Sequence, residues 1–201
     1  MTEMLICSAA ENEEPINDLK CSDESISYIS APRIDFYRAS LINCRFENCD
    51  FTGASFTDCV LTGCSFTECT FSGAYFRDTT LTDCAANGCS FTKALFRKSD
   101  ISSGYYRYAN FSDCVFESTS LSDVNMSESA FIQAKFKKSR LICCDLTKTD
   151  FLGTPLKGMD LSDCTISGIM LSEDLRELKG AKINSLQAAE LIRLLDIDVI
   201  L

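Results

Sequence analysis

The stretch FTGASFTDCVLTGCSFTECTFSGAYFRDTTL at residues 51–81 carries an apolar residue at every fifth position. The same step of five continues without a break from Phe36 to Leu171, and all 28 positions are apolar or aromatic. An α-helix repeats every 3.6 residues and a β-strand every 2, so neither holds every fifth side chain on one side. A chain that turns a corner every five residues can do so. The sequence therefore predicts an internally repeated, coiled fold.

A second period, four quintets long, lies within the first. One column has Phe at positions 36, 56, 76, 96, 116 and 136 and Leu at 156, and another has Leu or Ile at positions 41 to 161. Four sides per turn explain this sorting, because residues four quintets apart then stack directly on one another. One column is less regular, since the small Ala86 precedes the large Tyr106. We interpret this pair as volume compensation in a close-packed interior.

The residue two positions before each apolar centre is small. Of these 28 positions, ten are Cys, six Ala, four Thr, three Ser and one Gly. The other three residues of each quintet are mostly polar and are expected to face water. This pattern predicts an all-β solenoid, a square-section parallel β-helix with one large and one small inward residue per side. Seven coils stacked at the strand spacing of ~4.8 Å make a rod about 34 Å long.

Several quintets resemble the A(D/N)LXX motif of the pentapeptide-repeat proteins. Examples are Cys44-Arg45-Phe46-Glu47-Asn48, Ala54-Ser55-Phe56-Thr57-Asp58 and Cys144-Asp145-Leu146-Thr147-Lys148. The resemblance spans residues 34–173 in unbroken register. It implies a right-handed quadrilateral β-helix of about seven coils, in agreement with the usual handedness of parallel crossovers.

Thirteen cysteines suggest either a disulfide framework or a metal site, and both are outweighed by packing. Spacings such as Cys59, Cys64 and Cys69 lack the C-x2-C pattern of zinc sites, and the chain has no histidine. Free Cys is a small hydrophobic residue that suits the tight inward position. We find no apolar stretch of signal-peptide length in residues 1–33, and we expect free thiols, no metal, no cofactor and a reducing cytoplasm.

The two ends depart from the repeat, and we divide the chain into residues 1–33, 34–173 and 174–201. Residues 1–33 have seven acidic and two basic side chains and keep only part of the pattern. They are either a degraded first coil or a cap, and a solvated, partly mobile segment is the default expectation. In the C-terminal part, Ser185 is expected to cap a helix over residues 186–195, followed by a short strand from Ile197.

This C-terminal part is more apolar than a monomer surface requires. It resembles the C-terminal module of the quinolone-resistance pentapeptide-repeat proteins, which implies a homodimer joined end to end. The alternative is that all of it folds down as a cap. The dimerisation candidates are Leu191, Ile192, Leu194, Leu195, Ile197 and Val199.

No motif for catalysis is present, and we expect a binding protein rather than an enzyme. The resemblance implies a protein that binds DNA gyrase or topoisomerase IV as a duplex-DNA mimic and protects against fluoroquinolones. The alternative is a structural scaffold or adaptor with another protein partner. We expect no membrane contact and no direct binding of nucleic acid. The partner-binding candidates are Asp83, Asp100, Asp123, Asp160, Asp163, Tyr105, Arg107 and Tyr108.

The charge distribution supports the mimic only in part. A 34 Å length of B-DNA carries roughly 20 charges, whereas residues 34–173 have 17 acidic and 13 basic side chains. The aspartates among the candidates follow the Leu41 column and form the best acidic strip. A mildly basic stripe follows the Phe36 column, and a solvated face is the simpler interpretation of both. The basic stripe comprises Arg77, Arg97, Lys98, Lys137, Lys138 and Lys157.

Overall fold

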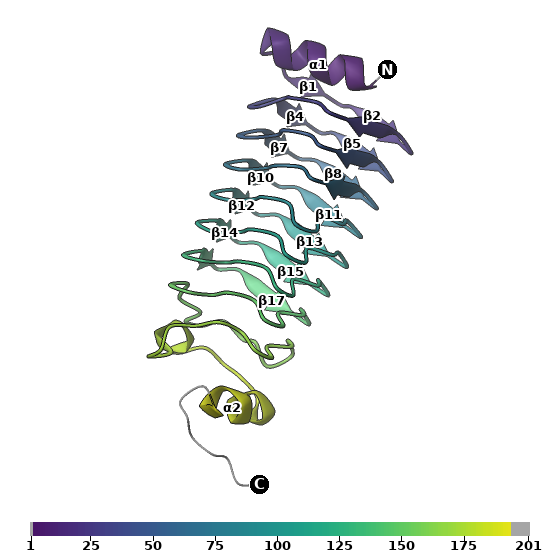
Figure 1. Ribbon diagram of the computed structural model, residues 1–201. Coiled ribbons are helices and arrows are strands. Elements are labelled where there is room, and N and C mark those ends of the chain that lie inside the picture. Colours follow the sequence, from purple (N-terminus) through teal and green to yellow (C-terminus); the bar gives the residue numbers. More distant parts are fainter. Residues whose placement is uncertain (1, 194–201) are drawn as a thin grey trace.

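The computed structural model describes residues 2–193, which form a parallel β-solenoid with a helix at each end (Figure 1). Each strand is two or three residues long and points one apolar side chain inward, because side chains alternate across a strand. The first face is the sheet of β1 (Ile16–Asn17), β4 (Asp35–Tyr37), β7 (Ser55–Thr57), β10 (Tyr75–Arg77), β12 (Leu95–Arg97), β14 (Val115–Glu117) and β16 (Lys135–Lys137).

The other three faces follow in order around the tube. The second face is β2 (Lys20–Ser22), β5 (Ser40–Ile42), β8 (Val60–Thr62), β11 (Thr80–Thr82), β13 (Asp100–Ser102), β15 (Ser120–Ser122) and β17 (Arg140–Ile142). The third face begins as β3 (Ser25–Ser27), β6 (Arg45–Glu47) and β9 (Ser65–Thr67) and continues as single bridges from Ala85 onward. The fourth face consists of single bridges throughout, from Ser30 to Met170. All pairings are parallel.

Strand and bridge residues pair with their counterparts four quintets later on all four faces, up to β16 and β17 on the first two, which confirms the predicted four-sided coil. Phe56 pairs with Phe76 and Phe76 with Phe96, and their rings stack with centroids 4.9 and 4.7 Å apart and nearly parallel planes. The Phe, Leu and Ile centres fill the axis, and almost all of them are buried. The all-β solenoid is therefore the fold that the five-residue repeat predicted.

The small inward position also contributes hydrogen bonds. Thr79 Oγ1 donates to the carbonyl of Phe56 at 2.9 Å, and Ser99 Oγ donates to the carbonyl of Phe76 at 3.2 Å. Cys114 Sγ makes the corresponding contact with the carbonyl of Phe91 at 2.8 Å. A thiol or hydroxyl at this position thus ties each coil to a carbonyl of the coil before it, while an alanine only fills the space. This explains why Cys, Thr, Ser and Ala alternate there.

Tyr106 is the exception in the aromatic interior. Its side chain is fully buried in the third-face column, above the small Ala86, as the volume argument requires. A Cβ atom on Gly104 would lie 2.6 Å from the carbonyl oxygen of Cys84 and 2.7 Å from Cε2 of Tyr106. Glycine at position 104 therefore makes room for the ring. The Tyr106 hydroxyl has no hydrogen-bond partner within residues 2–193.

The N-terminal residues form a helix and a further coil, in place of the loosely solvated segment expected from their acidity. Helix α1 (Thr2–Asn12) covers the first end of the tube with Thr2, Ile6 and Ala9 buried. The coil pairing already begins at Ile16, which lies opposite Phe36. Glu24 occupies a small inward position, and its Oε1 accepts a hydrogen bond from Thr2 Oγ1 at 2.8 Å. The helix thereby satisfies a carboxylate that the repeat alone would leave without a partner.

The last coil is closed by the 3-10 helix η1 (Arg176–Leu178) and helix α2 (Ser185–Ile192). The prediction of Ser185 as the cap of α2 is wrong by one position, because the N-cap is Asn184. Asn184 Oδ1 accepts a hydrogen bond from Gln187 N, and Gln187 Oε1 accepts one from Asn184 N. The buried Gln187 amide also donates to the carbonyls of Leu161 and Cys164. The expected strand from Ile197 and the last residues of the expected helix lie outside the described residues.

Glu177 of η1 is buried, and its carboxylate connects the cap to the last coils. Oε1 accepts from Gly153 N at 2.9 Å, and Oε2 accepts from Ser172 N at 3.2 Å and Ser172 Oγ at 2.6 Å. Burial by itself raises the pKa of this carboxyl group, but the hydrogen bonds from Ser172 and Gly153 outweigh burial and lower the pKa to about 2. The cap is therefore held by an ionised carboxylate.

We predict that Tyr106→Phe stabilises the protein. The substitution keeps the ring and removes a buried hydroxyl without a partner, whose desolvation costs about 1–3 kcal/mol. The melting temperature should rise by several degrees in thermal unfolding followed by circular dichroism. Tyr105→Phe is the control, since Tyr105 is 58% exposed and its change should leave the melting temperature where it was. A lower melting temperature for Tyr106→Phe would show that the Tyr106 hydroxyl does have a hydrogen-bond partner.

We predict that Glu177→Gln destabilises the protein at pH 7 by on the order of 2–3 kcal/mol, since an amide accepts these three hydrogen bonds poorly. The folded-state pKa lies below the ordinary value of 4.5, so the ionised group stabilises above pH 4.5 and this contribution is lost as the pH falls toward 2. The difference in unfolding free energy between the two proteins, from urea titrations, should shrink over that range. A difference that is constant with pH would refute the role of the charge.

Candidate functional site

One corner of the tube, between the second and third faces, carries a column of exposed polar residues. The backbone has positive φ at each of these positions from Asp23 to Cys143, a conformation that Asp, Asn and Gly adopt readily. Side chains at this corner point away from the core. The column comprises Asp23, Asn43, Gly63, Asp83, Ser103, Asp123, Cys143 and Asp163.

A groove of about 500 Å³ runs along this corner, and we call it the acidic groove. It lies where the third face has changed from three-residue strands to single bridges and where Gly104 has no side chain. The residues that line it are Asp83, Ser103, Gly104, Tyr105, Asp123, Val124, Asn125, Cys143 and Asp145. Three carboxylates, those of Asp83, Asp123 and Asp145, therefore border one hollow.

The groups in the acidic groove differ in how far they are already paired. Asp145 accepts hydrogen bonds from Thr147 and from Asn125 Nδ2. The carboxylates of Asp83 and Asp123 have no hydrogen-bond or ion-pair partner among the described residues. Partial loss of hydration and the neighbouring carboxylates of Asp163 and Asp123 raise the pKa of the Cys143 thiol. The groove is thus negative and has free acceptors for a cationic group.

The structure brings together some of the sequence candidates and separates others. Asp83, Asp123 and Tyr105 line the acidic groove, and Asp163 extends it, with Oδ2 3.7 Å from Cys143 Sγ. Asp100 and Asp160 lie on the second face beside the column rather than in it. Asp160 accepts from Ser162, which lowers its pKa, and approaches Lys182 Nζ at 3.9 Å.

Asp145, Asn125 and Cys143 are groove residues that were not among the sequence candidates. Asn125 and Asp145 directly precede third-face centres, and they lie one and two coils after Tyr105. Aligning the outward positions coil by coil, like the inward ones, places them beside Tyr105. The hollow itself depends on Gly104 and on the change of the third face, which charge patterns do not indicate.

Arg107 and Tyr108 lie at the next corner, between the third and fourth faces, and not in the groove. Arg107 Nη2 donates to Glu128 Oε1 and to Tyr108 Oη, both at 3.1 Å, and Tyr108 Oη donates to the same Glu128 oxygen at 3.0 Å. The guanidinium also lies 5.1 Å from the centroid of the Tyr108 ring. These three side chains satisfy one another, which makes them a surface cluster rather than a free recognition group.

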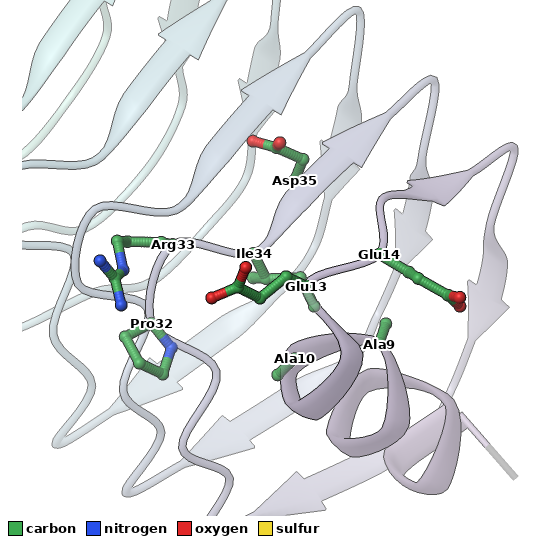
Figure 2. A pocket seen from close by; sticks show the side chains of 8 residues that line it. All are labelled: Ala9, Ala10, Glu13, Glu14, Pro32, Arg33, Ile34 and Asp35. Carbon is green, nitrogen blue, oxygen red and sulfur yellow. The ribbon is translucent and has the colours of Figure 1, made fainter.

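A second hollow, of about 360 Å³, lies between the end of α1 and the first coils (Figure 2). Ala9, Ala10, Glu13, Glu14, Pro32, Arg33, Ile34 and Asp35 line it. Three carboxylates and one guanidinium border it, and none of the partner-binding candidates from the sequence lies there. It marks the place where the capping helix passes into the coil.

The dimerisation candidates are divided between the core and the surface of the C-terminal helix. Leu191 is buried against the core, and Ile192 is 39% exposed. Leu186, which was not among the candidates, is 79% exposed. Leu194, Leu195, Ile197 and Val199 lie outside the described residues. The exposed apolar surface of α2 is therefore carried by Leu186 and Ile192.

Residues 2–193 contain no candidate metal cluster and no candidate membrane-spanning helix. No group of three or more Cys, Asp or Glu side chains there is arranged to hold a metal ion. None of the helices described is long and apolar enough to cross a membrane. The thirteen cysteines, all within the described part, are free thiols, and all but Cys7 and Cys143 are buried.

Comparison with known proteins identifies the repeat. A family model described as a pentapeptide repeat region matches residues 54–131, and a model of eight pentapeptide-repeat copies matches residues 34–73. Trypsin-treated QnrB1, a plasmid-mediated fluoroquinolone resistance protein, has 19% identity and a TM-score of 0.52, with 92% of this chain and 100% of that chain covered. HetL, from the cyanobacterium Nostoc sp. strain PCC 7120, has 15% identity and a TM-score of 0.25, with 92% and 97% covered. No curated protein sequence matches.

Proposed function

The chain is a pentapeptide-repeat protein, and from this premise we propose that it is a non-enzymatic binding protein for a type II topoisomerase. On this proposal the acidic side of the solenoid takes the place of duplex DNA on DNA gyrase or topoisomerase IV, and the protein protects the enzyme against fluoroquinolones. The thirteen free thiols suit the reducing cytoplasm in which such a partner works. QnrB1, whose fold is similar, is described as a fluoroquinolone resistance protein.

The single observation that supports the proposal is the acidic groove. A DNA-binding surface presents Lys and Arg side chains, and the groove offers Asp83 and Asp123 as free carboxylates two coils, or about 10 Å, apart. Tyr105 lies beside them and is 58% exposed, so a guanidinium can bind a carboxylate and pack on the ring at once. Carboxylates spaced so widely mimic a few phosphates of a duplex, not its full charge.

We predict that replacing the groove carboxylates weakens the effect on gyrase. In a supercoiling assay with ciprofloxacin, the protein at micromolar concentration should restore supercoiling. The triple variant Asp83→Asn, Asp123→Asn and Asp145→Asn should require at least about tenfold more protein, because each lost charge pair with a cationic partner weakens docking. Asn is tolerated at the positive φ of Asp83 and Asp123, so the corner backbone is preserved, and Asp145 lies on the third face without a positive φ.

The matched control removes three carboxylates from other corners: Asp58→Asn, Glu68→Gln and Asp113→Asn. These residues are exposed, and their loss should leave protection unchanged. Cys143 gives an independent reading, since a partner in the acidic groove should slow its alkylation. If neither topoisomerase responds to the protein and Cys143 stays reactive in their presence, the proposal fails and the scaffold or adaptor function takes its place.

The proposal includes a homodimer joined end to end through the C-terminal helices. It rests on the exposure of Leu186 near the start of α2 and of Ile192 at its end, since exposed apolar side chains on a terminal helix suit burial against a symmetric copy. The buried Leu191 would support the helix from within rather than contact the second copy.

We predict that Leu186→Asp together with Ile192→Asp converts a dimer of twice the chain mass into a monomer in light scattering. Two charges buried in a small apolar interface cost far more than the interface gains. Met4→Asp is the control at the opposite end, where Met4 is 77% exposed, and it should leave the mass unchanged. A wild-type protein of single-chain mass at micromolar concentration would count against the dimer.

A further inference from the structure

The cations of this acidic protein gather near its C-terminal end. Residues 135–140 contain four basic and no acidic side chains, in a chain of net charge −10. All four are exposed, on β16, on β17 and at the corner between them. Lys157 follows one coil later, and Lys179 belongs to the segment stacked on that coil, since Gly158 N donates to Gly180 O. We call Lys135, Lys137, Lys138, Arg140, Lys157 and Lys179 the basic surface.

Four arginines nearer the N-terminus contact a carboxylate, whereas the other cations there, Lys20, Arg33, Arg45, Lys93 and Lys98, form no ion pair within residues 2–193. Arg38 contacts Asp18 at 2.7 Å, Arg97 contacts Glu117 at 3.7 Å, and Arg107 contacts Glu128 at 3.1 Å. Within residues 2–193, no residue of the basic surface forms an ion pair. The basic surface therefore differs from the rest of the chain in density rather than in pairing alone, because four cations lie within six residues that contain no carboxylate.

The backbone is also open at this place. β16 and β17 are the last strands of their sheets, although the chain makes another coil over them. Pro155 has no N–H to donate to the carbonyl of Ala134, and Met159 puts a large side chain in a small inward position. Among the described residues, the N–H groups of Phe136, Lys138 and Leu141 have no hydrogen-bond acceptor.

Burial of the aromatic column agrees with this opening. Phe136 is the one Phe centre of the described chain that is only partly buried, while Phe116 directly below it is completely buried. The third and fourth faces stay paired, through the Asp145–Thr165 and Asp150–Met170 bridges. The strand pairing therefore ends on the first two faces, where the basic surface lies, and the N–H group of the exposed Lys138 adjoins the unpaired cations, whereas Leu141 is only 2% exposed.

Like charges at this spacing repel one another. Side chains on neighbouring residues of one face, or stacked one coil apart, lie roughly 5–7 Å from each other, inside the Debye length of ~8 Å. An anion with several charges relieves all of these repulsions together, whereas a single carboxylate relieves only one. Phosphate groups bind Lys and backbone N–H groups, and a chain of them matches a row of cations.

We propose that the basic surface binds a chain of closely spaced phosphate groups, as in single-stranded nucleic acid or inorganic polyphosphate. This differs from the expectation of no direct binding of nucleic acid. The coil separates the charges: the acidic groove lies at the corner between the second and third faces, and the basic surface on the first face and the edge of the second. The binding is independent of the proposed topoisomerase function, because it uses other residues.

The test is fluorescence anisotropy of the full chain with a labelled single-stranded oligonucleotide of about 12 nucleotides, with inorganic polyphosphate as competitor. We expect binding at about 50 mM salt, with the logarithm of the affinity falling by about 0.7 per engaged cation against the logarithm of salt. The triple variant Lys135→Gln, Lys137→Gln and Lys138→Gln should lower the affinity about tenfold or more and reduce that slope by roughly 2.

The matched control Arg77→Gln, Arg97→Gln and Lys98→Gln removes three cations from the same faces nearer the N-terminus and should change the affinity less than about twofold. Lys157→Gln is a milder second variant if the first unfolds. If polyphosphate displaces the oligonucleotide, the surface recognises the phosphate chain that both ligands share. If the oligonucleotide binds and polyphosphate does not displace it, the ligand is nucleic acid. Equal losses in the two triple variants, or no binding of either probe at about 50 mM salt, would overturn the proposal.

Discussion

The chain must return to the same angular position after every fourth quintet, and the rest of the structure depends on this constraint. A parallel ladder at ~4.8 Å spacing pairs each residue with its counterpart in the next coil, so every inward position meets a copy of itself. Phe stacks on Phe with nearly parallel rings because both are offered at the same angle. One mismatch in size is transmitted to the next coil, as Ala86, Gly104 and Tyr106 show.

This constraint determines what could be predicted from the sequence. The interior can be predicted directly from the sequence, because burial selects the residue type at each inward position. The periods of five and of twenty residues therefore predicted both the architecture and the core residues. The first coil was left as one of two alternatives, beside a cap, since Leu19 and Glu24 are large for the small inward position. Glu24 is acceptable only because α1 supplies Thr2 as a donor, and no repeat pattern contains that contact.

The outer surface is less readable because its residues are not selected by packing. Asp83 and Asp123 were found from charge alone, but the groove between them exists because Gly104 lacks a side chain and the third face changes its pairing. Arg107 and Tyr108 looked like a recognition pair in the sequence and turn out to be satisfied by Glu128, which lies one coil after Tyr108. Contacts between outward columns decide which charged groups remain free.

The same stacking converts a sequence of mixed charges into separate surfaces. Residues near one another in the chain can belong to different surfaces, as Arg140 lies on the second face and Cys143 at the corner that follows it. Asp83 and Asp123 share one groove although two full coils separate them in sequence. The net charge of the whole chain is therefore a poor guide to what a square solenoid binds, since each outward column has its own net charge. A partner contacts one or two columns at a time. The acidic groove and the basic surface consist of different outward residues, so substitutions in one should leave the other unchanged.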